Sequence, residues 1–349
     1  NVVLLTSINT SKPLWKFFLL VNTSCPSSYV CSAMIYHNIL MFCLVMGSSA
    51  HDIRICFYDL DQHYSLAGNI PTNLCNHIAY SERQASEITY IRELRESNPV
   101  LKILYHYQHG VGTFDVILSK LESLFETHNL DGIIFDSQVN TVDTLLYIPA
   151  VCNITKTLGK PCYITSTSIH NLSATTVREE IETLTDGVII NNGKGRTSKI
   201  LVPPTTRQNK YQRFLSLDEN IRFLSESGYP KTKMIGSINL ELGTLCKYNE
   251  TLKKMFGLAP TFGDKCHILP GATYAMYCTD KLMKWFEDNK EGFTYGYDEV
   301  SCAEGGYFAA FETPKSAEIK TKYMAEQGLG GFLFHSLILD KHNAEACDV

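Results

Sequence analysis

The sequence predicts a (β/α)8 barrel, an α/β fold of the TIM-barrel class, with a small α+β insertion between its seventh and eighth strands. From residue 51 onward, short apolar runs alternate with longer amphipathic stretches, which is typical of a parallel sheet with crossover helices. Eight such units can be counted, and eight close into a barrel more readily than they form an open sheet. The length of 349 residues also suits one α/β barrel.

The first four strands are expected at 53–58, 77–80, 101–105 and 131–138. Between them, helices are expected at 85–97 and 114–127. Ile88, Ile91 and Leu94 lie at helical spacing in the first helix, and the pair Asn98-Pro99 ends it, because a residue before proline avoids the helical conformation. The second helix places a row of leucines, with Phe125, on one face.

The second half of the chain continues the alternation. Strands are expected at 162–167, 187–190, 233–240 and 331–339, and helices at 142–158, 177–184, 217–227 and 314–327. The alternation breaks between about 245 and 311, where Gly, Pro, Tyr and Cys are frequent. This break predicts the insertion, which belongs to one large domain over 51–349.

The N-terminal part does not fit the barrel pattern. The segment 34–50 has an apolar run followed by the small residues Gly47-Ser48-Ser49-Ala50, which is the layout of a signal peptide cleaved after Ala50. An uncleaved signal anchor is the alternative, and membrane attachment is expected only in that case. Residues 1–33 have no interpretable pattern and stay unassigned.

The composition limits which binding partners and which cellular compartment are expected. The net charge of −5 and the hydrophobic content of 44% give no reason to expect nucleic-acid binding. We expect no cofactor and a monomer. Nine of the twelve cysteines follow residue 50, an odd number that agrees with export and leaves one thiol without an intramolecular partner. Three glycosylation acceptors follow residue 50 and are available if the chain is secreted; they begin at Asn153, Asn171 and Asn249.

The stretch that organises the chain is Asp131-Gly132-Ile133-Ile134-Phe135-Asp136-Ser137-Gln138. An apolar run followed by polar residues is how a buried parallel strand presents side chains at the open end of a barrel. The stretch resembles the D-G-x-D-x-D-x-E signature of glycoside hydrolase family 18, the chitinases and chitinase-like proteins. The final Glu of that signature is the general acid; here the position holds Gln138, and the second Asp is replaced by Ile134.

The resemblance extends over nearly all of residues 52–347. It implies a disulfide between Cys56 and Cys75, and a second one between Cys278 and Cys347. The pairs Gly330-Gly331 and Leu339-Asp340 resemble the final strand of the family. The pairing of the other cysteines stays open from the sequence: Cys152, Cys162, Cys246, Cys266 and Cys302.

The departures from the family pattern fall on its chemistry. The S-x-G-G of the third strand is replaced by 105–110, and Asn191-Asn192 occupy the region of a Tyr-Asp pair that holds the substrate amide. His335 stands where the family has a Trp that forms the floor of a sugar subsite. Because Gln138 cannot donate a proton usefully near neutral pH, the resemblance implies a pseudoenzyme that has no catalytic residue.

We therefore expect a secreted, catalytically inactive chitinase-like protein that binds chitin or chito-oligosaccharides. The candidate ligand-binding residues are Tyr58, Tyr107, Asp136, Gln138 and His335. An interaction or regulatory module without glycan affinity is the alternative, since Tyr rings also pack between strands and helices. An active hydrolase with a relocated acid, such as Glu241 beside Asp136, is less favoured. A metal site formed by Asp136 and the histidines 106, 109 and 335 is not expected, because the sequence has no His-x-His spacing.

Overall fold

The computed structural model describes residues 53–58, 75–81, 93, 95–96, 98–109, 114–137, 143–169, 176–190, 216–239, 245–247, 267–269, 283–288, 292–298 and 307–335. The predicted signal segment 34–50 and the unassigned segment 1–33 lie outside these residues. None of the helices in the described ranges has the length and hydropathy that crossing a bilayer would require.

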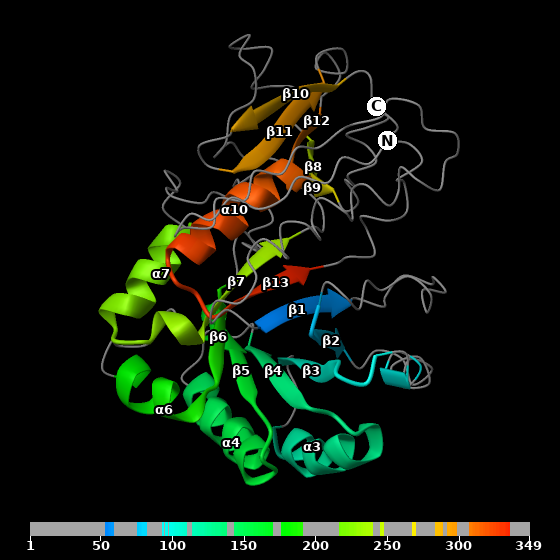
Figure 1. Cartoon of the computed structure of the whole chain (residues 1–349), viewed down its shortest axis with the longest axis vertical. Coiled ribbons are helices and arrows are strands. Elements are labelled where there is room, and N and C mark those ends of the chain that lie inside the picture. Colours follow the sequence, from blue (N-terminus) through cyan, green and yellow to red (C-terminus); the bar gives the residue numbers. More distant parts are fainter. Residues whose placement is uncertain are drawn as a thin grey trace, which may run out of the picture.

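Eight parallel strands form a closed barrel (Figure 1), in the order β1-β13-β7-β6-β5-β4-β3-β2. This confirms the predicted (β/α)8 fold. The strands are β1 (Ile53–Tyr58), β2 (His77–Ser81), β3 (Lys102–His109), β4 (Gly132–Ser137), β5 (Cys162–Thr165), β6 (Gly187–Ile190), β7 (Met234–Asn239) and β13 (Gly331–His335). The third strand runs four residues beyond its expected end, and the fifth is shorter than expected because Ser166–Ser168 forms a 3-10 turn.

Helices cover the outside of the barrel (Figure 1). They are α3 (Phe114–His128), α4 (Asp143–Thr157), α6 (Glu182–Leu184), α7 (Leu217–Glu226) and α10 (Pro314–Glu326). A π-helix at Val177–Ile181 precedes α6, and a 3-10 turn at Lys231–Lys233 precedes β7. Capping boxes begin α7 at Ser216 and α10 at Thr313, so that otherwise unpaired backbone N–H groups have acceptors. Of the helix expected at 85–97, only residues 93, 95 and 96 are described, and all three are helical.

A second sheet follows β7 and precedes β13, where the insertion was expected. Its strands are β8 (Leu245–Lys247), β9 (His267–Leu269), β10 (Met283–Asp288), β11 (Phe293–Asp298) and β12 (Tyr307–Phe311), in the order β10-β11-β12-β8-β9. All of its strand pairs are antiparallel. The sheet lies beyond α10, away from the helices α3 and α4 (Figure 1).

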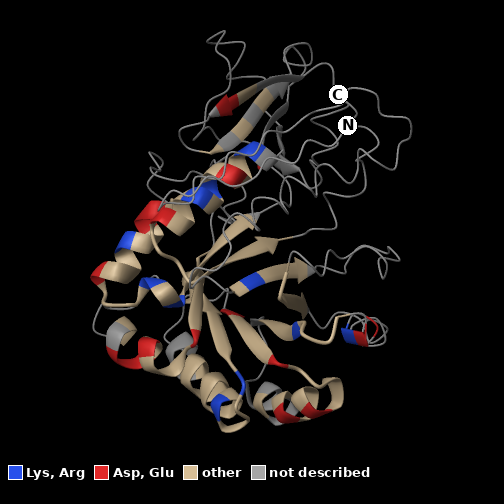
Figure 2. Cartoon of the chain, viewed as in Figure 1, with Lys and Arg blue, Asp and Glu red and all other residues tan. Residues whose placement is uncertain are grey.

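Two apolar clusters share the barrel. One fills its interior and includes Ile55, Leu104, Ile134, Tyr163 and Leu333. The larger one lies between the strands and the helices. Figure 2 shows the consequence for charge: the charged residues lie mainly on the helices and near strand ends, and the barrel strands are mostly uncharged.

At the amino-terminal end of the barrel, the same side-chain to backbone hydrogen bond joins neighbouring strands at three places. Asn76, Asp131 and Asp186 each directly precede a strand, and each accepts a backbone N–H of the strand before it, from Arg54, Ile103 and Cys162 respectively, at 2.8 Å. Asp131 also forms an ion pair with Arg95. These side chains satisfy N–H groups at the point where the ladder between neighbouring strands begins.

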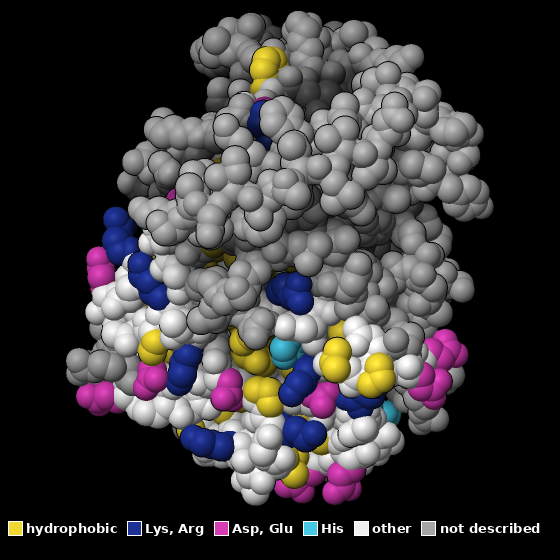
Figure 3. Space-filling model, viewed as in Figure 1, with side chains coloured by type: hydrophobic (Ala, Val, Ile, Leu, Met, Phe, Trp, Pro, Cys, Tyr) yellow, Lys and Arg dark blue, Asp and Glu magenta, His cyan; other side chains and the backbone are white. Residues whose placement is uncertain are grey.

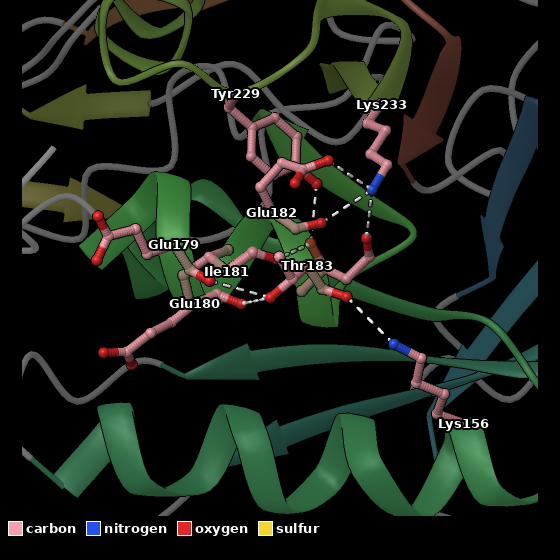
Figure 4. A network of polar contacts seen from close by, with 9 residues as sticks. Lys156, Glu179, Glu180, Ile181, Glu182, Thr183, Tyr229 and Lys233 are labelled. Atoms are coloured by element: carbon pink, nitrogen blue, oxygen red, sulfur yellow. Dashed lines mark hydrogen bonds and ion pairs between the residues drawn. The ribbon is translucent and has the colours of Figure 1, made fainter. Parts of the chain in front are cut away.

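Two lysines from other elements donate hydrogen bonds to the C-terminal end of α6 (Figure 4). Lys233 donates to the backbone carbonyl of Glu182 at 2.9 Å and to its carboxylate at 3.0 Å, and Lys156 donates to the carbonyl of Thr183 at 3.3 Å. A cation near a helix C-terminus satisfies orphan carbonyl groups and complements the helix dipole. Beside them, buried Thr185 and Tyr229 share a hydrogen bond of 2.9 Å.

Two disulfides are present in the described part of the chain. Cys56–Cys75 joins β1 to the residue two before β2, as the family resemblance implied. Cys152–Cys162 joins α4 to β5, a pairing that the sequence left open. Cys278 and Cys347, the other pair implied by the resemblance, lie outside the described residues.

His77 makes the stability of the barrel dependent on pH. Burial, together with Lys102, lowers the pKa of His77 to about 4, and its Nδ1 lies 2.7 Å from Asn76 Oδ1. Because the unfolded histidine takes up a proton near pH 6.5 and the folded one does not, stability is full above pH 6.5. It falls as the pH drops toward 4, by up to about 3 kcal/mol. Urea unfolding at pH 6.5 and 5 should show this loss, and a His77→Gln variant should lack most of it. An equal slope in both proteins would contradict the prediction.

Candidate functional site

The carboxyl-terminal end of the barrel interior carries polar side chains. Along each strand, inward-facing residues alternate with residues that face the helices. Two residues beyond the inward Leu104, Ile134, Tyr163 and Leu333, toward the carboxyl ends of the same strands, lie His106, Asp136, Thr165 and His335. These four residues, with Phe57 and Thr167, form what we call the barrel-mouth cluster. Active sites of this fold lie at this end.

Asp136 is the centre of the cluster. Its Oδ1 accepts hydrogen bonds from the hydroxyls of Thr165 at 2.7 Å and Thr167 at 3.4 Å. Its Oδ2 lies 3.6 Å from Nε2 of His106. Asp136 is only 9% exposed, so the threonine hydroxyls replace water around a carboxylate that would otherwise be costly to bury.

Aromatic rings pack beside Asp136. Phe57 meets the ring of His106 edge-on at 4.6 Å and the ring of His335 at 5.0 Å, between centroids. His335 is 8% exposed. At the position of the family's Trp, His335 is therefore packed against Phe57 inside the barrel and does not present a free ring face.

The threonines at the end of β5 are functional candidates that were missed from the sequence. Thr165 also shares hydrogen bonds with Thr167 at 2.8 Å and with Ser168 at 3.1 Å. The run Thr165-Ser166-Thr167-Ser168 after an apolar strand was the available signal. The 3-10 turn that ends β5 there curls the run back toward Asp136.

The interior beneath the cluster is apolar and uncharged. Ile134, at the position of the family's second Asp, is 1% exposed and belongs to the interior cluster. Burial, reinforced by Asp186, raises the pKa of Tyr163 to about 12, so its hydroxyl stays neutral. Among the described residues, Asp136 has partners on β3, on β5 and in the turn after β5.

The structure separates the residues that the sequence motif groups. Asp131 is at the opposite end of β4 from Asp136, where it binds Arg95 and the N–H of Ile103. The next residue, Gly132, has no room for a side chain, because a Cβ there would lie 2.8 Å from Pro161 and 2.9 Å from Leu104. The first Asp and the Gly of the motif are therefore structural.

Tyr107, a predicted ligand-binding residue, faces the helices. It packs on the outer cluster, and its ring stacks on Phe135 at 5.9 Å. It lies one residue beyond the inward His106, and the alternation of a strand turns it to the other face. Tyr58 ends β1, but its side chain is outside the described part of the chain, as are Gln138 and Glu241.

The cluster has the chemistry of a hydrogen-bonding site. It combines a carboxylate, two hydroxyls and two imidazoles, which can bind hydroxyl and amide groups. In the described ranges, no group of three or more His, Cys, Asp or Glu side chains could hold a metal ion. On the face shown in Figure 3, the described basic and acidic side chains are interspersed.

Comparisons with known proteins agree on the fold. No protein-family model matches the sequence, and a search of curated proteins found no match. Among solved structures, YKL-39 crystallised with chitooligosaccharides is similar, with a TM-score of 0.65 and 16% identity over 84% of this chain and 95% of the other.

Two plant proteins are also similar. A class V chitinase from Nicotiana tobaccum, in a glutamate-to-glutamine variant with NAG4, has a TM-score of 0.62 and 13% identity over 85% of this chain and 99% of the other. A chitinase-like agglutinin from Robinia pseudoacacia has a TM-score of 0.59 and 15% identity over 84% and 98%. The chain therefore has the fold of the family 18 chitinases and chitinase-like proteins.

Proposed function

We propose that this protein is an exported, catalytically inactive chitinase-like protein that binds chito-oligosaccharides at the barrel-mouth cluster. The observation that carries the proposal is the surroundings of Asp136. Its carboxylate is retained at the barrel mouth and is held in place by Thr165, Thr167 and His106, while Ile134 occupies the position of the neighbouring carboxylate of the family.

The lost groups explain why hydrolysis is not expected. Family 18 hydrolysis is substrate-assisted: the acetamido oxygen of the sugar attacks the anomeric carbon while the acid protonates the leaving oxygen. Gln138 cannot supply that proton, and general acid catalysis alone contributes about 10²–10⁴-fold. With Asn191-Asn192 in the region of the Tyr-Asp pair, the groups that orient the acetamido nucleophile are also missing.

Binding can persist when catalysis is lost, because hydrogen bonds to sugar hydroxyl and amide groups need no proton transfer. Similar structures support this part of the proposal. The tobacco chitinase was crystallised with NAG4 as a glutamate-to-glutamine variant, and YKL-39 was crystallised with chitooligosaccharides. A chitinase of this fold with such a substitution thus holds a sugar tetramer.

Two aspartates at opposite ends of β4, Asp136 within the strand and Asp131 just before it, provide a matched test of binding. We expect calorimetry with chitotetraose to detect binding to the wild type, and Asp136→Asn to weaken it at least about tenfold, since a hydrogen bond to a charged group contributes about 1.5–3 kcal/mol. Asp131→Asn, at the other end of β4, should leave the affinity unchanged. Equal effects of the two variants would place the ligand elsewhere.

Catalytic inactivity is tested separately with a chromogenic chito-oligosaccharide and an active chitinase as reference. No turnover above buffer is expected from the wild type. Turnover that disappears in a Gln138→Ala variant would overturn the proposed inactivity and leave the binding result untouched.

The second candidate is an interaction module without glycan affinity. It is favoured by the burial of Phe57, Asp136 and His335 and by the outward position of Tyr107, which leave no described aromatic ring available for stacking on a sugar at the barrel mouth. Absence of chitotetraose binding at millimolar ligand, with the wild type folded, would select this candidate.

A further inference from the structure

The helix α4 carries one of the three glycosylation acceptors that follow residue 50, Asn153-Ile154-Thr155. Asn153 is exposed, whereas Thr155 is fully buried. The hydroxyl of Thr155 donates to the backbone carbonyl of Cys152 at 2.9 Å. Residues two apart on a helix face different directions, so the folded helix presents the asparagine to solvent and hides the threonine.

Glycosylation of an asparagine needs both residues of the acceptor. The side-chain amide nitrogen of Asn forms a bond to the anomeric carbon of a lipid-linked oligosaccharide. The bond from that carbon to the lipid diphosphate breaks, and one amide proton is released. Acceptors normally lie in surface loops, where the hydroxyl residue can be reached together with the asparagine. In α4, Thr155 is already committed to the carbonyl of its own helix.

The disulfide next to the acceptor keeps α4 against β5 and so keeps Thr155 buried. Cys152 immediately precedes Asn153 and is bonded to Cys162 on β5, with a sequence separation of 10. Both cysteines are at most 1% exposed. Exposing Thr155 requires local unfolding of α4 from β5, and the disulfide keeps the two elements together.

We propose that Asn153 is a glycosylation site that is modified only before α4 packs on β5 and the Cys152–Cys162 disulfide closes. The folded protein can carry the glycan, because Asn153 faces solvent, but it cannot receive it. Occupancy at this site is then set by competition between glycan transfer and disulfide closure. The inference rests on the export that is part of the proposed function.

The first experiment compares the wild type with Cys162→Ser, each as the full chain behind an established cleavable secretion signal in insect cells. Peptide mass spectrometry after enzymatic deglycosylation measures the occupied fraction at each acceptor in whole-cell extracts, so a misfolded variant is still counted. We expect the fraction at Asn153 to rise from partial in the wild type to nearly complete in Cys162→Ser. The fraction at Asn249 should stay unchanged.

The second experiment presents purified, unglycosylated full-length protein to detergent-solubilised microsomes, which supply the transferase and the lipid-linked donor. Asn153 should be modified in the reduced, unfolded chain and not in the oxidised, native one. Equal modification of both forms, or equal occupancy of wild type and Cys162→Ser whether full or zero, would overturn the inference. Because the secretion signal is supplied, these outcomes do not depend on whether the native segment 34–50 directs export, which secretion of the chain without the added signal would test separately.

Discussion

Replacing Lys320 with methionine is expected to destabilise the protein by about 3–5 kcal/mol, because it leaves a buried charge without its partner. Lys320 on α10 pairs with Glu312, just before the helix, and the two side chains are 0% and 2% exposed. The second carboxylate oxygen of Glu312 accepts the hydroxyl of Ser316 at 2.7 Å. Urea unfolding at pH 7 measures the loss.

The loss should shrink in acid. Burial raises the pKa of Glu312, and the Lys320 ammonium opposes that shift by favouring the carboxylate. Without Lys320, the folded state holds a proton on Glu312 at a pH where the unfolded state has released it. Stability of the variant therefore falls as the pH rises above about 4.3, the ordinary value for Glu, and Lys320→Met should be less damaging at pH 4 than at pH 7.

An exposed ion pair on the same helix is the control. Lys315 pairs with Glu287 of β10 at 2.9 Å, but the two side chains are 54% and 38% exposed, so Lys315→Met should cost at most about 1 kcal/mol. The double variant Glu312→Gln/Lys320→Met should recover much of the loss. Equal costs for Lys315→Met and Lys320→Met would contradict the argument.

Gly330→Ala should cost about 3 kcal/mol or more, at the upper end of overpacking effects. A Cβ on Gly330 would lie 1.9 Å from the backbone oxygen of Thr232. Gly330 cannot move away easily, because its N–H donates to the carbonyl of Met234 at 2.8 Å. The clash is between two backbone segments that hold β13 against β7, its neighbour in the barrel.

Gly159→Ala is the control variant, because alanine at this position causes no steric overlap. Gly159 has a φ of +67°, but a Cβ added there would have no other atom within 4 Å. Alanine at this position therefore meets only the left-handed backbone penalty of about 1–2 kcal/mol. Chemical denaturation of both variants measures the difference. Gly330→Ala as stable as Gly159→Ala would show that the contact between these two segments can relax.

The positions of the elements were predictable from the sequence because each has a local signal. The β6 range, 187–190, agrees with its expected bounds, and β1 does so at 53–58. The end of β5 was not predictable in this way. Thr165 and Ser166–Ser168 contain neither Gly nor Pro, and Thr165 at the end of the strand contacts Asp136, 29 residues away in the chain.

Local sequence patterns did not predict which cysteines are paired or which residues of a strand face the barrel interior. Cys152 and Cys162 are joined because α4 packs on β5. The spacing of the cysteines in the sequence does not by itself predict that packing. In β3, the run from Ile103 to Tyr107 is apolar or aromatic on both faces, as in any strand buried on two sides. No pattern in this run therefore distinguishes His106, which faces the interior, from Tyr107, which faces the helices.

The amino-acid sequence by itself determined the eight-stranded barrel, the place of the insertion and the Asp136 position, since these depend on patterns within single segments. Only the tertiary structure decided what surrounds Asp136. Its partners Thr165 and His106 come from the neighbouring strands β5 and β3, and such partners are brought together by strand register and barrel closure, which no single segment encodes.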